Sequence, residues 1–282
     1  MLVFRDPDLL GRELAREILQ EAEKTRREGR TYLLGCPAGR SLHSTYASLA
    51  DLAAAQGADL SHFAAAMMDE YLVPTPDGPR LCPADGHYSC RGYGRREILD
   101  RINHGLPGSR QIPQENLWFP EPDDPTAYDE LLRGAGGVNL FLVATGASDG
   151  HVAFNPVGTP LTARTRVIQL SLATRRDNLE TFPGFASLDQ VPTLGVSVGL
   201  GTIAEQSRRV GRRTNALAQQ RFPLFQSRLI EITDSSDLKL RIVRKRRGVM
   251  LAALSHPDHD HRVLAHSSSS PPASEPLTRQ NG

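Results

Sequence analysis

The sequence predicts an α/β fold with a mainly parallel sheet that is covered by helices on both faces. Short apolar runs that stop at turn residues, at 31–35, 63–68 and 138–144, indicate buried strands. Stretches with apolar residues at helical spacing separate these runs. Repeated strand–loop–helix units form parallel sheets, because each connection crosses back over one face of the sheet.

The first part of the chain reads as helix, strand, loop and helix. Apolar residues recur at helical spacing over 8–27, where Asp8 is the expected N-cap. The buried strand at 31–35 follows, and a loop of small residues occupies 36–41. Helical patterning returns over 42–55, which completes one βα unit of a parallel sheet.

The central part alternates between apolar runs and loops. A strand is expected at 63–68, and the Pro- and Gly-rich residues 74–92 are expected to form a long functional loop. Helices are expected at 95–102 and 127–134, and the stretch 106–125 between them reads as a loop.

The run Val138–Ala144 (VNLFLVA) is the clearest buried strand. It leads into a glycine-containing segment at 145–155, and further strands are expected at 165–172 and 193–198. Ligands bind beyond the carboxyl ends of the strands in such sheets. Polar residues that directly follow a strand are therefore the candidates for a functional site.

We expect residues 1–209 to form one domain. From about Val210 the chain becomes strongly basic, and residues 210–265 are expected to be a divergent C-terminal region of the same domain. A shifted reading frame in a GC-rich gene is the alternative explanation for this change of character. The Ser- and Pro-rich tail at 266–282 is expected to be disordered.

Composition argues against several classes of protein. The 282 residues carry a formal net charge of +1, which favours neither nucleic acid nor a membrane surface as a partner. The three cysteines form no Cys-x-x-Cys pair, which argues against a disulfide framework and a zinc site. No stretch approaches the roughly 18 apolar residues of a membrane span, and the N-terminus lacks the apolar core of a signal peptide. We therefore expect a cytoplasmic protein, and leave open whether it forms a homo-oligomer.

Two polar clusters follow the first two predicted strands. Gly39, Arg40 and Ser41 precede a helix, where backbone N–H groups, a charge and a hydroxyl suit an anion. Asp69 and Glu70 are paired carboxylates, and repulsion between them would raise one pKa into the range of a general base. The alternative for the pair is a helix N-terminus, where acids are favoured without any function.

The third cluster is Asp149-Gly150-His151. His151 can move a proton in either direction near neutral pH, and Asp149 could orient its ring. A tight turn with a solvated aspartate and a packed histidine is the alternative. Together, an anion site, a carboxylate base and a histidine fit proton abstraction beside a carbonyl in a phosphorylated sugar.

Two longer segments resemble the signatures of the glucosamine-6-phosphate deaminase (isomerase) family: Met68-Asp-Glu-Tyr71 and Asp149-Gly-His-Val-Ala-Phe-Asn155. The loop Gly35–Ser41 is similar to that family's phosphate-binding loop, and His87-Tyr88-Ser89 to part of its active-site loop. The resemblance continues to about Ser207. Asp-Gly-His alone would also suit the related 6-phosphogluconolactonases.

The resemblance implies a three-layer, modified Rossmann-like fold and a mechanism without a metal or cofactor. It implies that Asp69 moves a proton between C2 and C1, that His151 and Asp149 open the pyranose ring, and that Gly39, Arg40 and Ser41 hold the phosphate. Glu70 is also expected to contact the substrate. The implied reaction converts glucosamine 6-phosphate to fructose 6-phosphate and ammonia.

Three departures from the family pattern affect this expectation. Pro156 stands where the family has a glutamate that tunes the histidine. Glu180 stands where a phosphate-binding arginine is expected, so Arg175 or Arg176 is expected to replace it. Val210–Asn215 stands in place of an apolar strand and a turn that carries a phosphate-binding lysine.

Two other functions remain open from the sequence. A 6-phosphogluconolactonase-like hydrolase would use His151 as the base that activates water. A catalytically impaired sugar-phosphate-binding protein would fit Pro156 and the altered C-terminal region.

Overall fold

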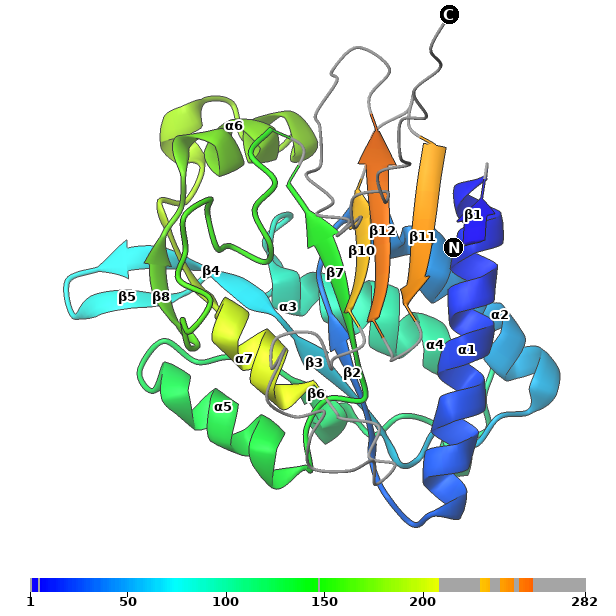
Figure 1. Ribbon diagram of the computed structural model, residues 1–282. Coiled ribbons are helices and arrows are strands. Elements are labelled where there is room, and N and C mark those ends of the chain that lie inside the picture. The colour runs from blue at the N-terminus through cyan, green and yellow to red at the C-terminus, as the bar shows by residue number, and fades with distance from the viewer. Residues whose placement is uncertain are drawn as a thin grey trace, which may run out of the picture.

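The main sheet of the protein has five parallel strands in the order β10-β7-β2-β3-β6 (Figure 1). The computed structural model describes residues 2–4, 6–146, 148–207, 229–233, 239–245 and 249–255. The strands of the main sheet are β2 (Tyr32–Cys36), β3 (Phe63–Met67), β6 (Leu117–Trp118), β7 (Leu140–Thr145) and β10 (Leu229–Thr233). The α/β fold with a mainly parallel sheet that the sequence predicts is confirmed.

Helices cover both faces of this sheet (Figure 1). One face carries α1 (Pro7–Arg27), α2 (His43–Gln56) and a helical stretch made of α3 (Cys90–Tyr93), a π-helical segment (Gly94–Asp100) and α4 (Arg101–Asn103). The other face carries α5 (Pro125–Gly134) and α7 (Leu200–Gln206). The N-cap of α1 is Asp6 and not the expected Asp8, because Pro7 fits the first helical position and Asp6 accepts from the backbone N–H of Asp8.

Strand β7 is buried on both faces, which explains why its sequence is a continuous apolar run. Leu140 and Leu142 belong to the core beneath α1 and α2, whereas Phe141 and Val143 belong to the core beneath α5 and α7. Successive side chains of a strand point to opposite faces. A strand buried on both faces therefore needs a continuous apolar run.

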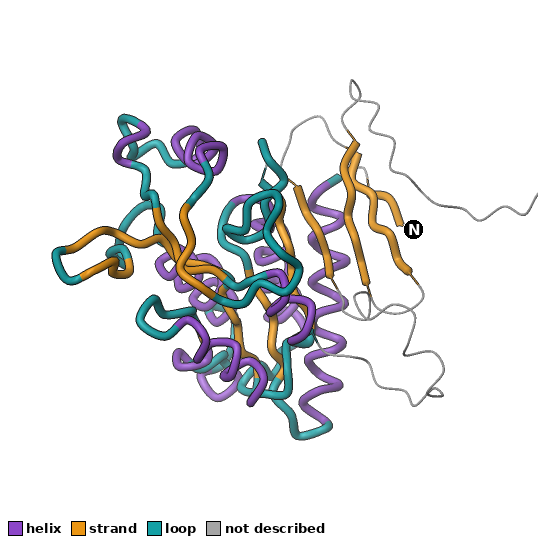
Figure 2. Tube along the Cα trace, turned by 60° about the vertical axis from the view of Figure 1, so that its left-hand side comes forward, coloured by secondary structure: helices purple, strands orange, loops and turns teal. Residues whose placement is uncertain are grey.

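A second sheet has four antiparallel strands in the order β5-β4-β9-β8 and lies on the side of the molecule away from α1 (Figures 1 and 2). Its strands are β4 (Asp69–Thr75), β5 (Gly78–Leu81), β8 (Arg166–Gln169) and β9 (Leu194–Ser197). The strands expected at 165–172 and 193–198 are present as β8 and β9, but they pair antiparallel in this second sheet. The expected loop 74–92 contains β5. An apolar run predicts a strand, but the partner of that strand depends on contacts distant in sequence.

The predicted strand 165–172 also ends early. Ser171 accepts from the backbone N–H of Thr174 and caps helix α6 (Leu172–Thr181), which the sequence analysis did not anticipate. Short 3₁₀ turns occupy Arg40–Leu42, Gly108–Arg110, Gln114–Asn116 and Leu188–Gln190. None of the helices in the described ranges is long and apolar enough to span a bilayer.

A third, antiparallel sheet combines β1 (Leu2–Phe4), β11 (Lys239–Lys245) and β12 (Val249–Ser255). The expected divergent region 210–265 thus contributes β10, β11 and β12, and β10 pairs with β7 in the main sheet. The residues next to Val210 and the tail 266–282 lie outside the described residues.

We predict that Gly35→Ala lowers the free energy of unfolding by about 1–3 kcal/mol, because a Cβ at this position would overlap the buried ring of Phe141. Urea unfolding measures the change. Gly134→Ala is the matched control, since a Cβ there meets no atom within 4 Å. Equal stabilities of the two variants would contradict this packing.

Candidate active site

The loops that follow β2 and β7 meet at the carboxyl edge of the main sheet. Strand β2 lies between β3 and β7, so the chain leaves β2 towards one side of the sheet and later returns on the other. Such a reversal opens a crevice beyond the strand ends. Here the crevice is a cavity of about 400 Å³ that both loops line, together with residues from β4, the segment 87–90 and α6.

Asp69 lies in the wall of this cavity. It is the first residue of β4, directly after Met68, and is only 6% exposed. Burial raises the pKa of Asp69 to about 7; a hydrogen bond from the Cys90 thiol opposes the rise and the charge of Glu70 adds to it. A carboxyl group with this pKa can both accept and release a proton near neutral pH.

Glu70 lies behind Asp69 and is not part of the cavity wall. Its carboxylate is fully buried and accepts from five donors. They are the backbone N–H groups of Tyr71, Cys90 and Arg91 at 2.8, 2.9 and 2.7 Å, the Ser89 hydroxyl at 2.9 Å and the Cys82 thiol at 3.3 Å. These contacts hold the segment 82–91 against β4, so the geometry favours an anchoring role for Glu70 over the expected substrate contact.

His151 is oriented by its neighbours. Its Nδ1 lies 2.6 Å from Asp149 Oδ1 and 3.2 Å from the Thr174 hydroxyl, while Asp149 Oδ2 accepts from Ser171 at 2.8 Å. Burial alone would raise the pKa of Asp149, but the hydrogen bonds from His151 and Ser171 outweigh it and lower that pKa. An ionised Asp149 favours a proton on Nδ1, which leaves Nε2 to exchange a proton within the cavity.

The segment around His151 has little conformational freedom. The His151 ring packs so closely on Gly146 that a Cβ there would overlap it, and Gly150 has φ of 69°. Ala153 has φ of 50°, a left-handed conformation that is uncommon for a residue other than glycine. Asn155 holds this turn through donations to the carbonyls of Val152 at 3.0 Å and Val198 at 2.7 Å. These contacts give a physical reason for the Gly, His and Asn of this segment.

The predicted anion-binding residues Gly39, Arg40 and Ser41 all line the cavity. Gly39 has φ of 102°, and the loop leads through a 3₁₀ turn into α2. Its backbone N–H groups and the start of a helix suit an anion. Arg96, from the π-helical segment, also lines the cavity, and the sequence analysis did not single it out.

Arg175 lies elsewhere than expected. Its guanidinium donates to the backbone carbonyls of Leu188 at 2.5 Å and Val191 at 3.2 Å, and it does not line the cavity. Glu180 does line the cavity, at the position where a phosphate-binding arginine was expected. The structure therefore puts a carboxylate from α6 in the cavity wall, and the arginines of the wall, Arg40 and Arg96, come from other elements.

Pro156 takes no part in the cavity wall. Its carbonyl accepts from the backbone N–H of Thr159 at 3.1 Å and from that residue's hydroxyl at 2.8 Å, so the chain makes a turn here. The polar partners of the His151 ring in this structure are instead Asp149 and Thr174. Thr174 was not predicted as a partner of His151; Ser171, a residue type that is favoured at a helix N-cap, is the sequence signal for the start of α6.

Aromatic rings from several segments of the cavity wall form one cluster. His87 stacks edge-on with Phe185, with centroids 4.6 Å apart, and lies 6.1 Å from Phe182. Tyr71 packs against Phe154 at 4.8 Å and Tyr88 at 5.5 Å. The rings join the segment 87–90 to the residues at the end of α6.

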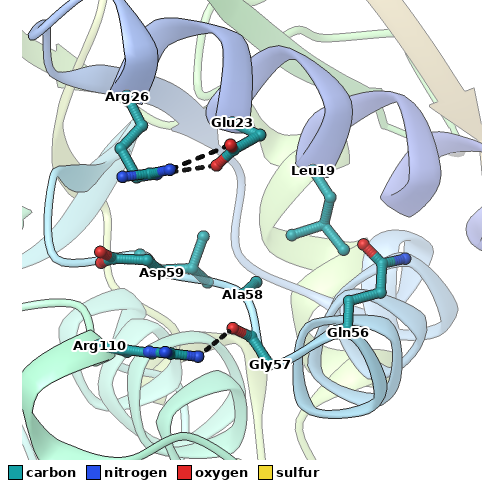
Figure 3. Close-up of a pocket in the computed structure, with 9 residues that line it drawn as sticks. Leu19, Glu23, Arg26, Gln56, Gly57, Ala58, Asp59 and Arg110 are labelled. Carbon is teal, nitrogen blue, oxygen red and sulfur yellow. Dashed lines mark hydrogen bonds and ion pairs between the residues drawn. The ribbon is translucent and has the colours of Figure 1, made fainter.

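A second cavity, of about 390 Å³, lies at the amino edge of the strands between α1, the end of α2 and Arg110 (Figure 3). Its charged groups are engaged with neighbours: Glu23 pairs with Arg26, and Arg110 donates to the carbonyl of Gly57 at 2.7 Å. None of the predicted site residues lines it. Within the described ranges, no group of three or more His, Cys, Asp or Glu side chains is placed to hold a metal ion.

Comparison with known proteins confirms the resemblance to glucosamine-6-phosphate deaminases. The chain is 31% identical to such a protein from Shouchella clausii over 178 residues, which is 61% of this chain and 64% of the relative. It is 35% identical to one from an Arthrobacter species over 173 residues, or 61% of each chain, and 27% identical to one from a Geobacillus species over 83% of this chain and 88% of the relative. The first two matches thus span less than two thirds of the relatives' length. No family model matches the chain.

Solved structures show the same fold. A monomeric glucosamine-6-phosphate deaminase superposes with a TM-score of 0.59 at 21% identity, covering 81% of this chain and 79% of that one. The 6-phosphogluconolactonase from Trypanosoma cruzi superposes with a TM-score of 0.52 at 15% identity, covering 82% and 78%. The predicted modified Rossmann-like architecture is thereby confirmed.

We predict that Asp69→Asn stabilises the protein increasingly as the pH rises. The folded-state pKa of about 7 lies above the ordinary value of 3.8, so the native state favours the protonated acid. The wild type therefore loses stability between about pH 4 and pH 7, and the asparagine variant does not. The difference in free energy of unfolding should reach the order of 4 kcal/mol above pH 7. Urea unfolding at pH 4 and pH 8 measures it, and a difference independent of pH would contradict the buried environment of Asp69.

Proposed function

We propose that this chain isomerises and deaminates glucosamine 6-phosphate, giving fructose 6-phosphate and ammonia. The observation that carries the proposal is a buried Asp69, with a pKa of about 7, in the same cavity as a histidine oriented by Asp149. The names of the curated relatives support the same reaction. The reaction belongs to amino-sugar catabolism, and three buried free cysteines are in keeping with the reducing environment of the cytoplasm.

His151 would act first, on the closed ring. Opening a pyranose requires a proton to leave the anomeric hydroxyl and a proton to reach the ring oxygen. The Nε2 of His151 is suited to carry that proton, because Asp149 occupies Nδ1 and stabilises the ring when it becomes charged.

Asp69 would act second, on the open chain. Its carboxylate would take the proton from C2, which the neighbouring aldehyde acidifies, and the resulting carboxylic acid would return a proton to C1. Once O1 has gained a proton and the nitrogen has lost one, the product is a 2-imino sugar, which water hydrolyses to the ketose and ammonia. The same group must accept and then donate, and a pKa near 7 serves both steps at neutral pH.

The phosphate would sit against Gly39, Arg40 and Ser41, with Arg96 supplying a second positive charge. Arg175 is not required for this, because its guanidinium is engaged with backbone carbonyls. Glu70 would act indirectly, by anchoring the segment that carries Ser89 and Cys90.

A 6-phosphogluconolactonase-like hydrolase is the second candidate. The fold similarity to the Trypanosoma cruzi lactonase favours it, and His151 would then activate water. Lactone hydrolysis gives a buried Asp69 no proton to move, which favours the isomerase. A sugar-phosphate-binding protein without turnover is the third candidate. It is favoured by Glu180, which lines the cavity where a phosphate-binding arginine was expected.

We predict that purified protein forms fructose 6-phosphate from glucosamine 6-phosphate, and that Asp69→Asn lowers kcat at least a hundredfold while the substrate still binds. A coupled assay for fructose 6-phosphate measures turnover, and thermal stabilisation by the sugar phosphate measures binding. Hydrolysis of 6-phosphogluconolactone without amino-sugar turnover would replace the proposal with the lactonase. Stabilisation without either turnover would support the binding protein.

We also predict that His151→Ala slows the reaction of the closed-ring substrate more than that of an open-chain analogue, because only the first needs ring opening. The ratio of kcat/KM for the two substrates measures the difference. Equal losses on both would remove His151 from the ring-opening step.

A further inference from the structure

Cys90 touches both carboxylates at the start of β4. It is 3% exposed, lines the cavity and begins α3. Its Sγ lies 3.4 Å from Asp69 Oδ1, and its backbone N–H donates to Glu70 Oε1 at 2.9 Å. Cys90 therefore contacts both Asp69, in the cavity wall, and Glu70, which lies behind it.

The contacts of Glu70 fix the position of the thiol. Ser89 donates its hydroxyl to Glu70 Oε2 at 2.9 Å and accepts from the backbone N–H of Gly92 at 3.1 Å, which caps α3. The backbone N–H of Arg91 donates to the same carboxylate oxygen at 2.7 Å. Because these bonds lie on both sides of Cys90 in the sequence, they fix its backbone against β4, and its Sγ lies beside Asp69.

The thiol is a donor at neutral pH. Burial, followed by the charges of Glu70 and Asp69, raises the pKa of Cys90 well above its ordinary value, so it keeps its proton. The titratable groups that face Asp69 from the packed elements are Glu70, Tyr71, Cys90, Tyr46 and Tyr128, with His151 across the cavity. Arg40 and Arg96 line the same cavity. Among the described residues, the side chain that hydrogen-bonds the Asp69 carboxylate is that of Cys90.

We propose that Cys90 is a positioning residue for Asp69: its thiol orients the carboxylate in the cavity and favours the ionised, proton-accepting form. A hydrogen bond to the charged form of an acid lowers the pKa, and here it counteracts burial. The role in turnover rests on the proposed function of Asp69, whereas the effect on the protonation of Asp69 does not.

Three kinds of substitution separate this role from simple packing. Cys90→Ala and Cys90→Val both remove the thiol that donates to Asp69. The alanine leaves a space where the thiol was, whereas the valine nearly fills it. Cys90→Ser keeps a donor. Cys82→Ala is the matched control, because it removes a thiol that donates to Glu70 at 3.3 Å and has no hydrogen bond to Asp69.

The first readout is the pH dependence of kcat for fructose 6-phosphate formation. The base must be ionised, so the acidic limb follows the pKa of Asp69, and loss of the donor moves its midpoint up by about 0.5–1 unit. Below the midpoint this is a loss of roughly three- to tenfold, with little change at high pH. Cys90→Ser should restore the wild-type midpoint, and Cys82→Ala should leave it in place.

The second readout needs no turnover. The carboxyl carbon of Asp69 is titrated by NMR in protein labelled at the aspartate side chain, with Asp69→Asn for assignment. An upward shift in Cys90→Ala and Cys90→Val, reversed in Cys90→Ser, supports the proposal even if the amino sugar is not a substrate. An unchanged titration of Asp69 in both donor-free variants overturns it, even if turnover is found as proposed.

Discussion

Two adjacent carboxylates with opposite surroundings set the character of this site. Neighbouring residues of a strand face opposite sides, and at the start of β4 this sends Glu70 towards five donors and Asp69 towards a cavity with one weak donor. Glu70 is buried without being unsatisfied, so it can anchor the segment 82–91. Asp69 is buried with little compensation, and its pKa rises to about 7. Two adjacent residues of β4 thus have different roles: Glu70 anchors the segment 82–91, and Asp69 is the group that titrates near neutral pH.

The second half of the site depends on a helix cap. Ser171 accepts from the backbone N–H of Thr174 to begin α6, and its hydroxyl donates to Asp149. Asp149 and Thr174 both contact Nδ1 of His151. The start of α6 and the orientation of the histidine are therefore determined by one hydrogen-bond network. A shift of α6 would therefore change the orientation of the His151 ring.

The sequence was sufficient for those features that are local. The run VNLFLVA predicted a strand buried on both faces, and Gly39, Arg40, Ser41, Asp69 and His151 were placed at strand ends that the structure brings to one cavity. Strand pairing between residues distant in sequence could not be predicted: β5, β4, β9 and β8 form a separate antiparallel sheet, and of these only β8 and β9 fall on runs that were predicted as strands.

The roles of single side chains also depended on contacts that no pattern shows. Arg175 looked available for phosphate but is engaged by the carbonyls of Leu188 and Val191. Glu70 looked like a substrate contact but lies behind the cavity wall. Cys90 belongs to no motif, and its place beside Asp69 follows from the way the segment 82–91 folds back over β4.

In the proposed reaction, the cavity moves a proton from C2 of an amino-sugar phosphate. Turnover of glucosamine 6-phosphate that carries deuterium at C2 tests it most directly, with NMR following the label in the product. Proton transfer by Asp69 predicts that the deuterium is found at C1 of fructose 6-phosphate or in water, and that the deuterated substrate reacts more slowly than the unlabelled one when cleavage of the C2–H bond limits the rate. Recovery of the amino sugar with its C2 label intact, under conditions where 6-phosphogluconolactone is hydrolysed, would contradict it.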